Sequence, residues 1–259
     1  RKDIEKAIKQ GERHFDPGVL ASANRGLLYI DEVNLLDDHV VDLLLDSAAM
    51  GVNIVEREGI SFSHPARFIL VGTMNPEEGD LRPQLLDRFA LSVDIQGLVE
   101  SADRVSIMER MLQFESKPIV FQEKWQSNVD TISSDIVSAR KIVDKVDYSR
   151  MNLENIAALT TSLGVEGHRA DLVILRAARA HAALHRRESI TDNDVLIAAQ
   201  LALPHRVKNG PFEAVGLGIG ELEQRLEETH SSNQQSDADQ SDTESSDNQT
   251  QIKKKTRLI

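Results

Sequence analysis

The feature that most constrains this chain is a short apolar run ending in two adjacent acids, Leu27-Leu28-Tyr29-Ile30-Asp31-Glu32. Such a run predicts a buried parallel strand that delivers both carboxylates to the open edge of a sheet, where α/β proteins bind ligands. Asp31 is then placed to hold a magnesium ion, usually through water, and Glu32 to activate a water that attacks a γ-phosphate. The alternative is a strand that simply runs into a loop.

A second buried strand is predicted in Arg67-Phe68-Ile69-Leu70-Val71-Gly72-Thr73-Met74-Asn75-Pro76, and it too ends on a polar residue, Asn75. Because the carboxyl ends of parallel strands meet at one edge of a sheet, Asn75 is predicted to lie on the same edge as Glu32. A neutral amide there can hold the water and the γ-phosphate without adding charge. The alternative for Asn75 is a turn former before Pro76.

The residues between the two runs predict a helix and then a hairpin. Apolar side chains at helical spacing predict a helix over residues 38–50, which Asp37 can cap and Gly51 ends. Alternating residues around a Gly turn predict a β-hairpin over 52–63. Periodicity further predicts helices over 2–13, 81–89, 101–115, 118–128, 131–146, 150–163, 168–187 and 192–203, and a strand over 91–95.

Three regions are predicted along the chain. Residues 1–98 have α/β character and include the hairpin, residues 99–228 are helical throughout, and residues 229–259 form a polar, acidic linker. The linker contains too few apolar residues to offset chain entropy, so it is predicted to be disordered. Apolar residues return at its end, which indicates a further domain, and the missing initiator Met indicates a fragment.

Composition excludes several classes of protein. The net charge of −12 repels nucleic acid phosphates, and an aromatic content of 4% leaves few side chains for base stacking. No apolar run approaches the roughly 18 residues of a membrane span. The absence of Cys suits a reducing compartment, so cytoplasm is the predicted location.

Two arginines are candidates for contact with phosphates. Arg88 follows an apolar pair and Asp87, and it could reach a neighbouring subunit's site to neutralise developing charge. Its alternative is a local salt bridge with Asp87. Arg169 begins a helix after a Gly-rich turn over residues 164–167 and could reach the phosphates from the helical region. Its alternative is a surface arginine at a helix start.

Other catalytic patterns are weak or absent. His181 and His185 are spaced i, i+4 and could chelate a metal, but no Glu is arranged between them, so a solvated helix face is predicted. Acyl transfer has no support, since the chain has neither a Gly-x-Ser-x-Gly elbow nor a Cys. No Gly-Lys pair is present, so these residues contain no P-loop to cradle phosphates.

Several motifs together closely resemble the AAA+ ATPase subunit of magnesium chelatase, and the resemblance runs to about residue 220. The motifs are Leu28-Tyr29-Ile30-Asp31-Glu32-Val33-Asn34-Leu35-Leu36, Val55-Glu56-Arg57-Glu58-Gly59-Ile60, His64-Pro65-Ala66-Arg67-Phe68 and Gly72-Thr73-Met74-Asn75-Pro76-Glu77-Glu78-Gly79 with its continuation to Phe89. The resemblance implies an AAA+ parallel-sheet core, incomplete because the P-loop lies upstream, followed by a helical lid domain and a disordered acidic tail.

The resemblance also implies a role for each candidate residue. Asp31 and Glu32 would be the Walker B acids, Asn75 the first sensor, Arg88 the arginine finger and Arg169 the second sensor. The implied cofactors are ATP and Mg²⁺. The hairpin over residues 52–63 would be an insertion that faces the pore of a ring or a partner. Without its P-loop, the isolated fragment is expected neither to bind ATP tightly nor to hydrolyse it.

The implied activity is that of a motor. A ring of like or homologous AAA+ subunits would hydrolyse ATP and drive a large tetrapyrrole-binding subunit to insert Mg²⁺ or Co²⁺, the ligase reaction of chlorophyll or porphyrin biosynthesis. Gly167-His168-Arg169-Ala170-Asp171-Leu172 and Ala202-Leu203-Pro204-His205-Arg206 look more like D-type or fused forms, which carry an integrin-like domain in cis or meet one in trans.

Two other functions stay open at this point. One is an AAA+ chaperone or remodelling ATPase that acts with an integrin-like partner and no tetrapyrrole. The other is a non-catalytic platform subunit, against which the intact Asp31, Glu32, Asn75 and Arg88 argue.

Overall fold

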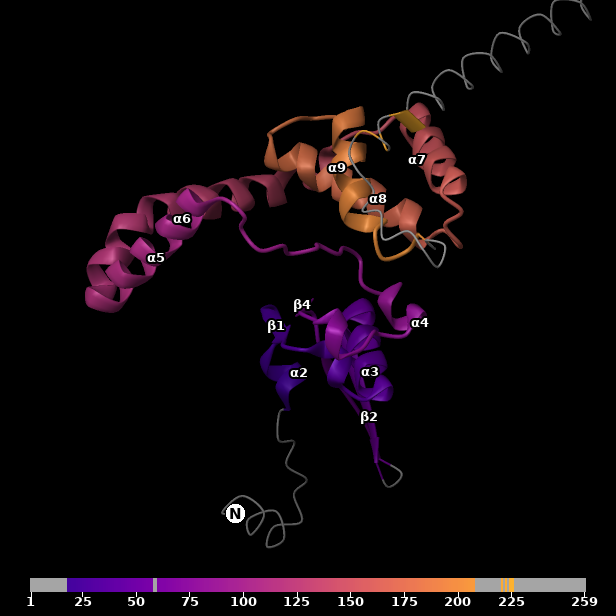
Figure 1. Ribbon diagram of the computed structural model, residues 1–259. Helices are drawn as coiled ribbons and strands as arrows, with labels where there is room; N and C mark the ends of the chain where they lie inside the picture. Colours follow the sequence, from indigo (N-terminus) through magenta and orange to yellow (C-terminus); the bar gives the residue numbers. More distant parts are fainter. Residues whose placement is uncertain (1–17, 58–59, 208–219, 221, 223, 226–259) are drawn as a thin grey trace, which may run out of the picture. The chain divides into compact units, whose positions relative to one another are not determined.

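The computed structural model describes residues 18–57, 60–207, 220, 222 and 224–225 (Figure 1). The chain divides into two compact units, Arg1–Phe89 and Ala90–Ile259. The predicted helix over 2–13 and the predicted linker over 229–259 lie outside the described residues. The predicted domain boundary at 98/99 stays a prediction.

The first unit is built on two parallel strands that are adjacent in space but distant in sequence. Strand β1 (Leu27–Ile30) pairs with β4 (Ile69–Gly72), with Leu27 opposite Ile69 and Ile30 opposite Gly72. A short helix, α2 (Val19–Ser22), precedes β1. The predicted parallel pairing is therefore confirmed, and the residues after both strands emerge at one edge.

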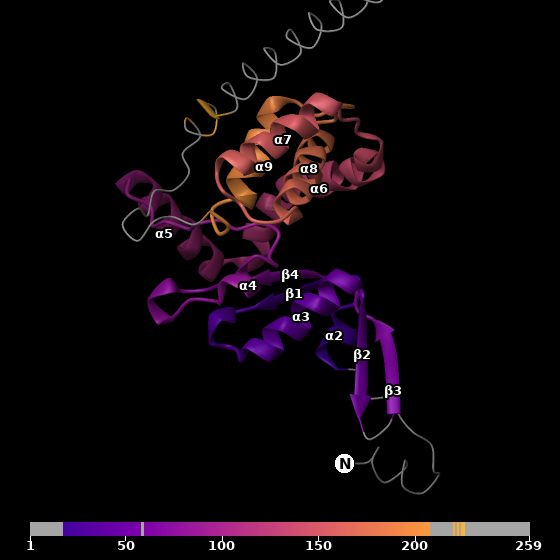
Figure 2. The same ribbon diagram turned by 90° about the vertical axis from the view of Figure 1, so that its right-hand side faces the viewer.

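Helix α3 (Asp38–Met50) packs against this pair of strands, as Figure 2 shows. Val41 and Leu45 on its apolar side join a core with three residues from elsewhere in the unit, Val33, Leu81 and Leu85. Asp37 occupies the N-cap position, but its side chain makes no capping hydrogen bond. Gly51 ends the helix in the left-handed conformation with φ of 69°, as its place in the sequence predicts.

The two strands are less buried than their sequences predict. Leu27 and Tyr29 on one face of β1 are 58% and 55% exposed, while Ile30 and Leu70 pack against the core on the other face. The reason is that α3 covers one side of the sheet, and no described element covers Leu27 and Tyr29 on the opposite side.

A hairpin separates α3 from β4. Strands β2 (Val52–Arg57) and β3 (Ile60–Pro65) are antiparallel, with Val55 opposite Phe62, and Figure 2 shows them extending away from the other two strands. The turn at 58–59 lies outside the described residues. The remaining short elements of this unit are η1 (Val33–Leu35), η2 (Pro76–Glu78) and α4 (Pro83–Leu86).

The strand predicted over residues 91–95 is wrong. This segment has no regular structure, because among the residues that the structure describes no strand lies beside it to accept a ladder of hydrogen bonds. Its backbone is held instead by the Ser92 N–H, which donates to the Leu201 carbonyl at 2.8 Å.

The second unit is helical, as predicted. Among its described residues are the helices α5 (Ser101–Ser116), α6 (Pro118–Ile142), α7 (Arg150–Ser162), α8 (Arg169–Leu184) and α9 (Asp192–Ala202), with a 3-10 turn, η3 (Val143–Lys145), after α6. The two helices predicted over 118–128 and 131–146 are one continuous helix, α6. Val129 and Asp130 at the predicted break are exposed and lie within the helix, where the Asp130 side chain accepts from Gln126 at 2.8 Å.

The core of the second unit lies among α7, α8 and α9. Ile156, Leu159, Ile174, Val195 and Leu203 are all fully buried there. Helices α5 and α6, by contrast, contain no buried residue. None of the described helices combines the length and the apolar character needed to cross a bilayer.

Candidate functional site

The carboxylate of Asp31 lies where β1 and β4 end together. Its Oδ1 accepts hydrogen bonds from the Thr73 hydroxyl at 2.6 Å and from the Tyr29 hydroxyl at 3.0 Å. These two bonds, the one from Thr73 foremost, hold the pKa of Asp31 below its ordinary value. Asp31 is therefore an exposed, ionised carboxylate at neutral pH.

The backbone turns sharply at Glu32. This residue is left-handed, with φ of 51° and ψ of 53°, a conformation that side-chain-bearing residues rarely adopt. Its N–H donates to Thr73 Oγ1 at 3.2 Å, and the N–H of Val33 donates to the Thr73 carbonyl at 2.8 Å. The chain is thus bent away from the strand direction, and Glu32 is exposed beside Asp31.

Asn75 lies on the same edge, with its side chain already engaged. Its Oδ1 accepts from the Glu77 N–H at 3.2 Å and caps η2, which is the turn-forming behaviour expected as the alternative. Asn34 after β1 donates from Nδ2 to the carbonyls of Asn75 at 3.3 Å and Gly79 at 2.8 Å. The loops after the two strands are therefore tied together.

Arg88 does not lie with these residues. Its Nη1 forms ion pairs with Asp42 and with Asp46 of α3, the latter at 2.8 Å, and its side chain is 32% exposed. One turn earlier on α3, Asp38 pairs with Arg82 at 2.5 Å. Arg88 therefore forms its ion pairs with residues of α3. The alternative considered from the sequence was a salt bridge with the adjacent residue, Asp87.

Arg169 belongs to the second unit, where it is the first residue of α8. The preceding turn contains two glycines with positive φ, Gly164 at 65° and Gly167 at 77°, as a Gly-rich turn predicts. Asp171 in the first turn of α8 accepts from the Thr160 hydroxyl at 2.7 Å and so joins α8 to α7. The phosphate-contacting role of Arg169 stays a prediction.

The solvated face predicted for His181 is wrong. Its Nδ1 lies 2.5 Å from Oδ1 of Asp194, which is fully buried and also bonds both terminal nitrogens of Arg187. This arrangement is a structural network between α8 and α9. Within the residues that the structure describes, no group of three or more His, Asp or Glu side chains is arranged to hold a metal ion.

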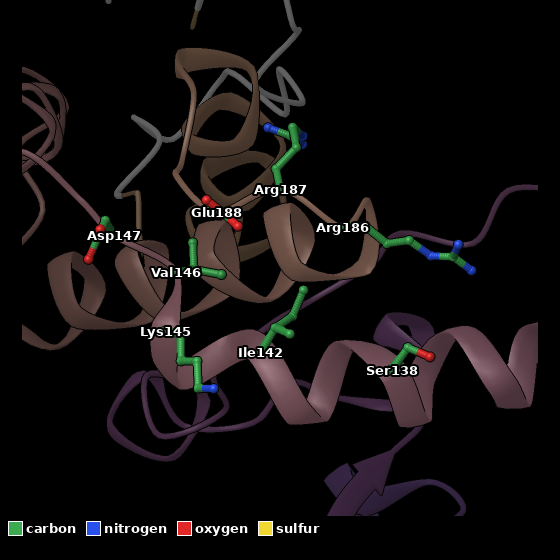
Figure 3. Close-up of a pocket in the computed structure, with 8 residues that line it drawn as sticks. All are labelled: Ser138, Ile142, Lys145, Val146, Asp147, Arg186, Arg187 and Glu188. Atoms are coloured by element: carbon green, nitrogen blue, oxygen red, sulfur yellow. The ribbon is translucent and has the colours of Figure 1, made fainter.

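A cavity in the second unit is not lined by any of the candidate residues Asp31, Glu32, Asn75, Arg88 and Arg169. It has a volume of about 590 Å³, and Figure 3 shows two of its arginines, Arg186 and Arg187, extending in different directions. Arg186 pairs with Asp135 at 2.8 Å and Arg187 with Asp194. Because both guanidinium groups are engaged in ion pairs, the edge of the sheet is the stronger candidate. The cavity is lined by Ser138, Ile142, Lys145, Val146, Asp147, Arg186, Arg187 and Glu188.

The sequence argument missed Thr73. Its hydroxyl contacts Asp31 and the backbone of Glu32, whereas the Asn75 side chain accepts from the Glu77 N–H. A signal was available, since Thr73 is the first residue after β4, just as Asp31 is the first residue after β1.

Parallel strands ending in an acid pair, a hydroxyl and an amide, together with a separate helical unit, are typical of the AAA+ fold. A putative ATPase from Cytophaga hutchinsonii shares this fold with a TM-score of 0.57 and 19% identity, over 78% of this chain and 64% of that one. Two family descriptions match as well: "Magnesium chelatase, subunit ChlI" over residues 4–85 and "AAA lid domain" over residues 153–228.

Curated relatives place the chain more narrowly. The magnesium-chelatase subunit ChlI homolog of Methanocaldococcus jannaschii is 50% identical over 231 residues, which are 89% of this chain and 63% of the relative. Magnesium-chelatase subunit ChlI of Euglena gracilis is 50% identical over 216 residues, 83% of this chain and 62% of the relative. The chain therefore belongs to the magnesium-chelatase ChlI family, and it spans just over three fifths of the length of these relatives.

Proposed function

We propose that this chain forms part of the ATPase motor subunit of a metal chelatase. In this proposal ATP hydrolysis in a ring of AAA+ subunits drives a large tetrapyrrole-binding subunit to insert Mg²⁺. The observation that carries the proposal is the ionised Asp31 beside Glu32 at a sheet edge shared with Asn75. Relatives named as magnesium-chelatase subunits favour this function over a chaperone without a tetrapyrrole.

The residues at the edge fit ATP with Mg²⁺. Both hydroxyl donors to Asp31 bond Oδ1, which leaves Oδ2 for a magnesium-bound water, and oxygen ligands are those that Mg²⁺ prefers. Bound Mg²⁺ would neutralise negative charge on the phosphates. We assign to Glu32 the orientation and deprotonation of the attacking water, and to Asn75 the holding of that water and the γ-phosphate. For this role, Asn75 has to exchange its bond with the Glu77 N–H for one to the ligand.

The two arginines would act from further away. Arg88 would stabilise developing charge on a nucleotide held by a neighbouring subunit, after exchanging Asp42 and Asp46 for phosphate oxygens. Arg169, at the start of α8, would contact the phosphates from the helical lid. The exposed Ile54 and Phe62 of the hairpin offer a surface for the ring pore or for a partner, including an integrin-like domain.

The test is ATP hydrolysis by the full-length protein with Glu32→Gln. Removing a general base costs about 10²- to 10⁴-fold in rate, so kcat should fall by at least about a hundredfold while nucleotide binding persists. Glu109→Gln on α5, which removes the same charge at an exposed position, should keep wild-type turnover. Metal insertion is followed by the absorbance of the metallated tetrapyrrole when the large subunit is added, and it should fail with Glu32→Gln.

Two outcomes contradict the proposal. One is a Glu32→Gln variant that hydrolyses ATP at the wild-type rate. The other is a wild-type protein that hydrolyses ATP but supports no metal insertion with its tetrapyrrole-binding partner. That result would support the ATPase activity and contradict the chelatase function.

A further inference from the structure

Thr73 joins the ends of the two strands through every polar group it has. Its N–H donates to the Ile30 carbonyl at 3.0 Å, and its carbonyl accepts from the Val33 N–H at 2.8 Å. Its hydroxyl accepts from the Glu32 N–H at 3.2 Å and donates to Asp31 Oδ1 at 2.6 Å. One side chain therefore contacts both acids, the first through its carboxylate and the second through its backbone.

The direction of these bonds follows from chemistry. A backbone N–H can only donate, so the Thr73 oxygen is the acceptor for Glu32. An ionised carboxylate can only accept, so the Thr73 proton points to Asp31. Both functions of the hydroxyl are used at once, and a side chain of similar shape without a hydroxyl, such as Val, can replace neither bond.

The backbone of Glu32 adds a second reason for a hydroxyl at this position. Glu32 is left-handed, and this conformation is unfavourable for a residue with a side chain unless its surroundings hold it. Thr73 Oγ1 is the partner of the Glu32 N–H, and the next N–H, of Val33, bonds the Thr73 carbonyl. The turn that presents the Glu32 carboxylate therefore depends on Thr73.

We infer that Thr73 is the positioning residue of the acid pair. Its hydroxyl sets the rotamer of Asp31 toward the magnesium-bound water and holds Glu32 in the turn that aims its carboxylate at the attacking water. This inference rests on the proposed ATPase function. It assigns to Thr73 the task of orienting the two acids through its hydroxyl.

The test compares Thr73→Val with Thr73→Ser in the full-length protein. Losing a group that orients a metal-binding or catalytic side chain typically costs about 10- to 100-fold in metal affinity or activity. Thr73→Val should lower kcat by about tenfold or more and raise the Mg²⁺ concentration needed for half-maximal rate, with KM for ATP at saturating Mg²⁺ nearly unchanged. Thr73→Ser keeps the hydroxyl and should restore both parameters to near the wild-type values.

A merely structural role gives a different pattern. Thr73→Val would then lower the thermal midpoint without changing kcat or the Mg²⁺ requirement below that midpoint, and this result overturns the inference. A Thr73→Ser variant as impaired as Thr73→Val also overturns it, since the hydroxyl would not be the cause. If Thr73→Val does not fold, Thr73→Ala takes its place with the same expected outcomes.

Glu32→Gln, measured in parallel, separates this inference from the proposed function. Wild-type turnover by Glu32→Gln contradicts the proposed ATPase site as a whole. The other informative result is that Glu32→Gln is inactive while Thr73→Val keeps the wild-type kcat and Mg²⁺ dependence. This result contradicts only the positioning role of Thr73 and leaves the proposed ATPase site in place.

Discussion

At the scale of single residues, Asp194 shows how a buried charge is kept in this chain. Burial raises the pKa of its carboxyl, but hydrogen bonds from Arg187, His181 and Thr191 outweigh burial and hold the pKa well below the ordinary range. Asp194 also accepts from the Thr191 N–H at 2.7 Å, which completes the capping box at the start of α9. A single carboxylate thus caps α9 and binds His181 near the end of α8 and Arg187 in the segment after it.

We expect Asp194→Asn to destabilise the second unit. Breaking a buried pair leaves Arg187 without its partner and costs about 3–5 kcal/mol in the free energy of unfolding, measured by chemical denaturation at pH 7. Asp144→Asn, which removes an exposed charge in η3, should change that free energy by less than about 0.5 kcal/mol.

The effect of Asp194→Asn should depend on pH with a definite sign. Because the folded pKa is depressed, the stability contributed by Asp194 is present above the unfolded pKa of about 3.9 and is lost as pH falls toward the folded value. The difference in unfolding free energy between wild type and Asp194→Asn should therefore narrow below about pH 4. A difference that stays constant from pH 7 to pH 3 would show that the ionised form is not the stabilising one.

At the scale of elements, α3 connects the sheet, the hairpin and the segment that carries Arg88. Its Asp38, Asp42 and Asp46 lie one turn apart and pair with the two arginines of residues 82–88. These pairs are partly exposed, and such pairs contribute little to stability, so the helix depends on its buried side and its ends. Gly51 matters because it turns the chain from α3 into β2.

Gly51→Ala should destabilise the first unit. An alanine would have to adopt a φ of 69°, and its Cβ would lie 3.0 Å from Arg67 Cγ. The left-handed conformation alone costs about 1–2 kcal/mol in a residue with a side chain, which we expect as the loss in unfolding free energy. Gly97→Ala, where an added Cβ meets nothing within 4 Å, is the matched control and should be nearly neutral. Equal effects of the two substitutions would contradict this explanation.

At the scale of the whole molecule, the chain builds two separate hydrophobic cores, one around Val41 and Leu45 and one around Ile174 and Leu203. Large apolar side chains also stay exposed on β1, β4, α5 and α6. Under the proposed function, each catalytic site takes Glu32 from one subunit and Arg88 from its neighbour.

Mixing two inactive variants tests this sharing of sites. Glu32→Gln and Arg88→Ala should each abolish most ATP hydrolysis alone, yet an equal mixture in one ring forms some sites with both wild-type residues. With random assembly of a closed ring, about a quarter of the sites regain both residues, so hydrolysis should recover to about that fraction. No recovery, with mixed rings demonstrated by mass spectrometry, would place Arg88 in the site of its own subunit or outside any site.

Much of the fold and part of the candidate site could be predicted from the sequence. The parallel strands that bring Asp31 and Asn75 to one edge and the helix ended by Gly51 both follow from short-range patterns. The wrong predictions have different causes. The segment 91–95 alternates like a strand, but no described strand lies beside it. The break predicted near residue 129 does not occur, because the exposed side chains there are accommodated on the surface of α6.

The sequence by itself determined that the helix over 38–50 ends at Gly51 and that two strands carry polar tips, because those features depend on residues a few positions apart. Only the tertiary structure decided that Thr73 binds both acids, that Arg88 pairs with α3 and that His181 meets Asp194. Each of these contacts joins residues at least 13 positions apart, so it depends on how the elements pack and on which buried polar groups must find a partner.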